Sequence, residues 1–149
     1  IEGDLDALKY LDFDDMPDVS YLFAESKLDP QELYWNLNNV TDMSFMLYNA
    51  VNFNSASISG WNTENVVTME SMFEGASGYD GNLSDISGWN VVKVSNMTNM
   101  FKGAASFNQD ISIWDVELID SKPDGFDEDC LTTWVGFGSA DQEGQVGED

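Results

Sequence analysis

The sequence predicts an α/β solenoid, in which repeats of about 25 residues stack on one another and each holds one short strand and one short helix. Three observations lead to this fold class. Tryptophans recur at a nearly constant spacing, methionines recur in phase with them, and each interval combines a helix-like apolar stripe with a β-branched segment. We therefore expect the strands to form a short parallel sheet, with the helices on the opposite side.

The repeat is visible in the tryptophan and methionine columns. The tryptophans are separated by 26, 28 and 25 residues, at Trp35, Trp61, Trp89 and Trp114. Six of the seven methionines fall in two further columns, Met43, Met69 and Met97, and Met46, Met72 and Met100. The seventh, Met16, precedes Val40 by 24 residues, which indicates a degenerate first repeat.

The expected helix of each repeat is a one-sided apolar stripe. Met43, Met46, Leu47 and Ala50 have the i, i+3, i+4, i+7 spacing of a short amphipathic helix. A polar residue such as Asp42 stands before the stripe, where it can cap the helix. Gly75 and Gly103 lie near the expected helix ends.

The expected strands are the β-branched and aromatic segments around the later tryptophans, ISGWN at 58–62 and 86–90 and ISIWD at 111–115. One repeat buries too little apolar surface to fold alone, so neighbouring repeats must pack in register. This predicts contacts between Trp61 and Trp89 and between Met72 and Met100.

Two polar columns also follow the repeat, Ser59, Ser87 and Ser112, and Asn36, Asn62, Asn90 and Asp115. Such columns satisfy one another and the backbone at bends, which favours a structural role. A row that faces a ligand is the alternative.

The net charge excludes several kinds of partner. The chain has 28 Asp and Glu residues against five Lys, with no Arg and no His, and a formal charge of -23. Nucleic acid and anionic membrane surfaces require clustered cations, so we expect neither, and no segment predicts direct insertion into a membrane. An acidic coat that keeps the protein soluble explains the charge, and a surface for divalent cations or a basic partner is the alternative.

Calcium is the cofactor that the residues leave open. Its oxygen ligands would come from the segment IDSKPDGFDEDC, at Asp120, Asp124, Asp127 and Asp129, although the EF-hand spacing is absent. We predict no other cofactor, because the chain lacks a phosphate-binding glycine motif and any histidine ligand.

The residues do not predict an enzyme. Cys130 is the one cysteine and has no histidine to activate it, so neither a disulfide nor a thiol nucleophile is expected. A pair of carboxylates acting as a glycosidase stays an alternative. Three glycosylation sequons occur, at Asn39, Asn82 and Asn96, and Asn82 lies in the inserted loop GNLSD, so it is the predicted acceptor.

The phrases WNTENVVTMESMFEGAS, WNVVKVSNMTNMFKGAASFNQDIS and FNQDISIWDV resemble the repeats of BspA-like surface proteins, also called mycoplasma lipoprotein-type repeats. The resemblance covers roughly residues 35–119. It implies a leucine-rich-repeat-like fold on a secreted or cell-surface protein that binds proteins, matrix or cells, with no catalytic motif.

This resemblance completes the predicted organisation and function. We expect a degenerate N-terminal repeat or cap at 1–27, BspA-like repeats at 28–119, a C-terminal cap with Trp134 and Phe137 at 120–138, and an acidic tail at 139–149. The chain begins with Ile1, which we interpret as a processed form or a fragment. The predicted function is a non-catalytic extracellular or cell-surface module for protein interaction and adhesion. A structural subunit that packs on neighbouring subunits in a larger assembly or filament is the alternative.

Overall fold

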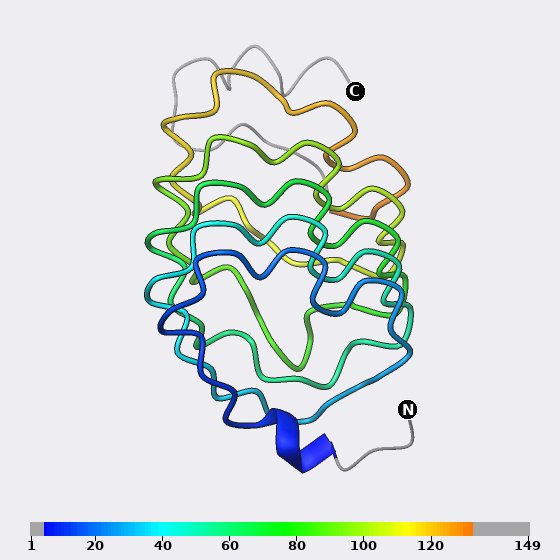
Figure 1. Ribbon diagram of the computed structural model, residues 1–149. Coiled ribbons are helices and arrows are strands. Elements are labelled where there is room, and N and C mark those ends of the chain that lie inside the picture. The colour runs from blue at the N-terminus through cyan, green and yellow to red at the C-terminus, as the bar shows by residue number, and fades with distance from the viewer. Residues whose placement is uncertain (1–4, 133–149) are drawn as a thin grey trace.

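The computed structural model describes residues 5–132 (Figure 1). Within them the chain forms one helix, the short 3-10 helix η1 at Leu5–Leu8. Pairing between segments is limited to isolated parallel bridges, which join Asp12 to Asn36, Asp18 to Asp42, Asp42 to Thr68, and Thr68 to Asn96. The predicted α/β solenoid, with its leucine-rich-repeat-like strand-plus-helix repeats and short parallel sheet, is therefore wrong as a fold class.

Tight turns take the place of the predicted helices and strands. Segments of similar path lie one above another along the molecule (Figure 1). Hydrogen bonds join five of them in order, at 17–25, 41–49, 67–75, 95–103 and 123–129. We call these the first to fifth ladder segments.

Backbone amides in a ladder segment alternate between two kinds of partner. The Met46 N–H donates to the Met43 carbonyl at 3.3 Å and closes a turn within the segment. The neighbouring Phe45 N–H donates to the Glu70 carbonyl of the next segment at 2.8 Å. The same alternation links the other segments, so backbone groups are satisfied without the i to i−4 bonds of an α-helix.

Left-handed residues explain why the apolar stripe does not form a helix. Phe45 and Asn49 have φ values of 56° and 53°, and a right-handed helix cannot pass through such residues. The other segments repeat both positions, as Tyr21, Ser71, Asn99 and Gly125 in one column and Glu25, Gly75, Gly103 and Asp129 in the other. The predicted helix from Met43 to Ala50 is therefore wrong, and Gly75 and Gly103 belong to a left-handed column instead of capping a helix.

The segments predicted as strands are turns. The Trp61 N–H donates to the Ile58 carbonyl at 3.2 Å, which closes a turn through Ser59 and Gly60. The same bond joins Trp89 to Ile86 and Trp114 to Ile111, each at 3.1 Å. The turn directs the isoleucine and the tryptophan into the core, where all six side chains are buried.

A column of stacked tryptophan rings runs through the core, beside buried methionine and aliphatic side chains. The Trp61 ring lies 5.4 Å from Trp35 and 6.3 Å from Trp89, nearly parallel to both. The predicted contact between Trp61 and Trp89 is thus confirmed. Each indole N–H also donates to a backbone carbonyl of the preceding turn, in the pairs Trp35 to Leu8, Trp61 to Leu33, Trp89 to Ile58 and Trp114 to Ile86.

Part of the predicted C-terminal cap lies outside the described residues. This part includes Trp134 and Phe137, and the predicted acidic tail at 139–149 lies outside them as well. The bounds of the four predicted segments stay predictions.

Candidate functional site

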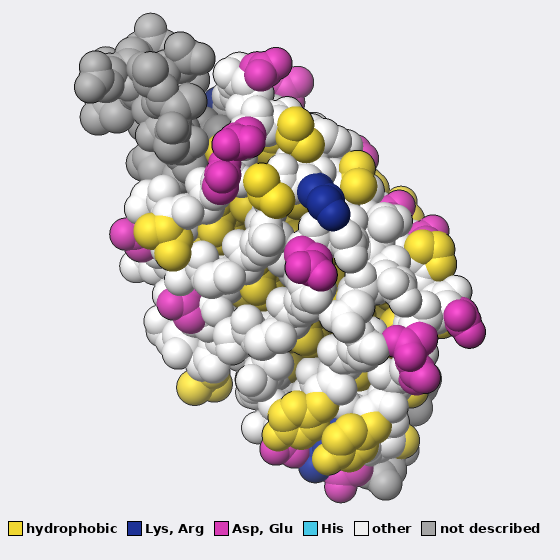
Figure 2. Space-filling view, turned by 90° about the vertical axis from the view of Figure 1, so that its left-hand side faces the viewer, with side chains coloured by type: hydrophobic (Ala, Val, Ile, Leu, Met, Phe, Trp, Pro, Cys, Tyr) yellow, Lys and Arg dark blue, Asp and Glu magenta, His cyan; other side chains and the backbone are white. Residues whose placement is uncertain are grey.

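The surface carries many carboxylates and few cations. Within residues 5–132, lysines pair with Asp6, Glu32, Asp127 and Glu128. Figure 2 shows carboxylates scattered over one face, with hydrophobic side chains gathered at its lower end, where Figure 1 places the N-terminal residues. The negative charge of the chain is therefore largely unneutralised by its own lysines.

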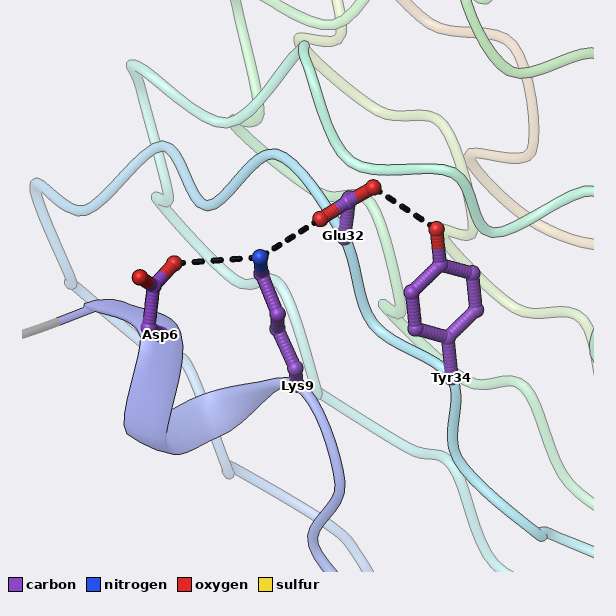
Figure 3. A network of polar contacts seen from close by, with 4 residues as sticks. All are labelled: Asp6, Lys9, Glu32 and Tyr34. Carbon is purple, nitrogen blue, oxygen red and sulfur yellow. Dashed lines mark hydrogen bonds and ion pairs between the residues drawn. The ribbon is translucent and has the colours of Figure 1, made fainter.

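One polar network ties the N-terminal residues to the second turn of the chain (Figure 3). Lys9 Nζ lies 2.7 Å from a Glu32 carboxylate oxygen and 3.1 Å from an Asp6 oxygen. The Tyr34 hydroxyl donates to the other Glu32 oxygen at 2.7 Å. The hydrogen bond that Lys9 donates to Glu32, and then the one to Asp6, raises the pKa of Lys9. The bonds from Lys9 and then from Tyr34 lower the pKa of Glu32. Asp6 and Tyr34 are exposed and Lys9 and Glu32 are partly exposed, so the network orients the N-terminal residues and adds little stability.

The four aspartates predicted to bind calcium do not form a cluster. Asp127 pairs with Lys122 at 2.8 Å, and Asp129 occupies a left-handed position of the fifth ladder segment. Asp120 and Asp124 line a shallow polar depression of about 330 Å³ between residues 95–98 and 118–124. Among residues 5–132, no three acidic or cysteine side chains come together in a way that could hold a metal ion. Calcium binding stays a prediction.

Asn82, the predicted glycosylation site, is exposed. Its side-chain oxygen accepts a hydrogen bond from Gln109 at 3.1 Å, and its N–H donates to the Asp80 carboxylate at 2.8 Å. A buried hydrogen bond holds the loop that carries Asn82, since the Tyr79 hydroxyl donates to the Ser84 carbonyl at 2.7 Å. Glycosylation at Asn82 stays a prediction.

The asparagine column has the structural role that the sequence favours. The side-chain oxygens of Asn36, Asn62 and Asn90 each accept the N–H two residues later, at 3.0 to 3.1 Å. Such bonds stabilise turns in the manner of an Asx-turn. In the serine column, Ser112 donates to Asp110 and lowers the pKa of that carboxyl.

The buried Tyr79 and the half-buried Cys130 are not placed beside groups that could make either of them catalytic. Burial, and then Asp85 and Asp80, raise the pKa of Tyr79, which keeps the hydroxyl protonated for its bond to Ser84. Burial also raises the pKa of the Cys130 thiol, which lies 3.6 Å from the Phe107 carbonyl. Both groups therefore act as neutral hydrogen-bonding side chains.

Sequence reasoning missed two aromatic pairs at the surface of the first two turns. Tyr10 stacks on Tyr34 with ring centroids 5.7 Å apart, and Tyr21 stacks on Phe45 at 4.8 Å. The rings of each pair are 24 residues apart, so the repeat spacing itself could have found them. They give the N-terminal end an apolar surface beside its carboxylates.

Comparison with known proteins shows the family of the chain. The family model described as "Mycoplasma protein of unknown function, DUF285" matches residues 17–130. The chain belongs to this family. The DUF285 match begins at the first ladder segment and ends just after the fifth, so it spans the whole hydrogen-bonded stack. No curated protein and no solved structure matches the chain. Among residues 5–132, no helix has the length and apolar character needed to cross a bilayer.

Proposed function

We propose that the chain is a non-catalytic module of a secreted or cell-surface protein, of the BspA-like type, that binds a basic protein partner. The observation that carries this proposal is the unneutralised acidic surface of a chain with a formal charge of -23. Carboxylates spread over a surface attract a cationic partner, increase its rate of association and repel acidic competitors. The repeat resemblance supports protein binding and supplies no catalytic residue.

Binding to purified extracellular and matrix proteins of different charge would test this function. We expect basic proteins to bind, with affinity falling at least about tenfold when the salt concentration rises from low to well above physiological. Neutral and acidic proteins of similar size are the matched controls. Equal binding of neutral and basic proteins, or no binding at all, would contradict the proposal.

A structural subunit of a larger assembly is the second candidate, and one observation favours it. Large apolar side chains, among them Tyr10, Met16 and Tyr21, are exposed at the N-terminal end of the stack. Light scattering over a range of concentrations would reveal an assembling subunit as a rising mass. A constant monomer mass, with and without added salt, would exclude it.

A further inference from the structure

The N-terminal end of the stack leaves part of the apolar core uncovered. Met16 and Leu22 are 48% and 40% exposed. Val40 and Met46, which occupy the same repeat positions 24 residues later, are 0% exposed. The second turn of the chain is covered by the first, whereas the first has no such neighbour among the described residues. Its exposed side chains are thus suited to burial by another segment.

The same end presents a row of backbone acceptors. In the second ladder segment, the carbonyls accept hydrogen bonds of 2.6 to 3.1 Å from amides of the first, at Asp42, Ser44, Met46 and Tyr48. The equivalent carbonyls of the first ladder segment receive none within residues 5–132, at Asp18, Ser20, Leu22 and Ala24. An open row of this kind is a template for an added segment of the same path, which would donate every second amide, as the first ladder segment does to the second.

The charge around this acceptor row is negative. Asp14 and Asp15 lead into the first ladder segment, Asp18 lies near its start and Glu25 at its end, and all four residues are exposed. The aligned carbonyls add their partial negative charges at the same edge. Lys9, the lysine that precedes this acidic run, is already held by Asp6 and Glu32. A cationic segment therefore complements this edge.

Tyr21 extends the surface beside the acceptor row. Its ring lies parallel to Phe45 at 4.8 Å and is the exposed end of that stack, with 57% of the residue accessible. The open face of a tyrosine ring attracts a lysine or arginine cation and also packs against apolar groups.

We propose that the first ladder segment is a docking edge for a peptide that follows the path of a ladder segment and alternates apolar residues with lysine or arginine. This inference rests on the proposed function, because it names the chemistry of the basic partner. The peptide amides donate to the four open carbonyls and its apolar side chains cover Met16 and Leu22. Its cations meet the carboxylates and Tyr21.

A second copy of the chain fits this edge less well. The last described turn of a second copy would bring the exposed Asp124, Glu128 and Asp129 towards the carboxylates of the first ladder segment. Like charges at close range oppose that contact. Two N-terminal ends facing each other would pair acceptors with acceptors, so that arrangement supplies no donors.

Synthetic peptides of alternating valine and lysine would test the docking edge. Three versions carry equal charge: one unmodified, one N-methylated at every valine and one N-methylated at every lysine. Only every second amide of a ladder segment donates to the next segment, so methylation in one register removes these donors and in the other leaves them. By calorimetry, we expect one methylated peptide to bind at least about tenfold more weakly than the other two peptides.

Variants of the protein locate the site. We expect Tyr21→Asn to weaken binding of the unmodified peptide, because asparagine keeps the left-handed backbone and removes the ring. Ile113→Asn, at an exposed position of another turn, is the matched control and should not change it. Amide NMR shifts should change at residues 18–25.

Each outcome separates the docking edge from the function on which it rests. Equal, salt-sensitive binding of all three peptides would contradict the docking edge, but it would still support a cationic partner. No binding by any peptide would overturn both. If the protein self-associates and Tyr21→Asn abolishes this association, the edge binds a second copy of the chain and the proposal of a docked peptide is wrong.

Discussion

Replacing Trp61 by phenylalanine tests whether stacked rings and indole hydrogen bonds hold the turns of the chain together. Trp61 is buried between Trp35 and Trp89, and its indole N–H donates to the carbonyl of the buried Leu33 at 3.0 Å. The change leaves that carbonyl without its donor, which costs about 1 to 3 kcal/mol. The smaller ring leaves space in the stack, which adds about 1 kcal/mol. We therefore expect Trp61→Phe to lower the free energy of unfolding by about 2 to 4 kcal/mol.

Urea denaturation followed by circular dichroism would measure this loss. A benzothienylalanine at position 61 has nearly the shape of tryptophan without its N–H, so it isolates the hydrogen bond. We expect that analogue to lose about 1 to 3 kcal/mol. A loss below about 0.5 kcal/mol, the lower limit for a typical hydrogen bond, would refute the role of the indole donor.

Three further predictions concern the backbone, the charge and the thiol. Gly103→Ala should lower the free energy of unfolding, measured in urea, by about 1 kcal/mol, because its φ of 71° strains a residue that has a Cβ. The Cβ itself has room, since the nearest atom lies 3.7 Å away. Gly103→Asn should cost less stability, and equal losses for the two variants would count against left-handed strain. Added salt should raise the melting temperature by about 3 °C, because screening relieves about 1 kcal/mol of repulsion between carboxylates. A lower melting temperature in salt would show that attractive charge pairs dominate. Alkylation of Cys130 near pH 8 should be slower in the folded protein than in urea, because burial raises the pKa of the thiol, and equal rates would contradict that burial.

The sequence predicts the spacing of the repeat better than its conformation. Trp61 and Trp89 pack as the column of tryptophans requires, because only neighbouring turns can bury such large rings. The helix between Met43 and Ala50 was wrong because its apolar spacing also suits successive turns that direct the same side chains inwards. Nothing in the side chain of Phe45 indicates a φ of 56°, since phenylalanine rarely adopts that conformation.

Polar residues at the repeat spacing indicated turns, although the sequence analysis interpreted them as helix caps. Asp42 was expected to cap a helix, and its carboxylate instead accepts both the N–H and the hydroxyl of Ser44, at 2.8 and 2.6 Å. A bond to the residue two positions later is typical of a turn, and aspartate favours both turns and helix caps. Asx-turns at Asn36, Asn62 and Asn90 repeat this chemistry. Recurrent Asp or Asn at the repeat spacing therefore indicated turns as strongly as caps.

The acidic segment before Cys130 shows which part of a repeat persists when its side chains change. Gly125 and Asp129 have φ values of 64° and 58° and occupy the two left-handed columns. Phe126 is fully buried, and its carbonyl accepts the Phe101 N–H at 2.9 Å. The segment is thus a fifth copy of the ladder, although its aspartates conceal the apolar pattern. The buried inward position and the left-handed backbone are retained because the neighbouring turn requires both, while the exposed positions between them are free to become acidic.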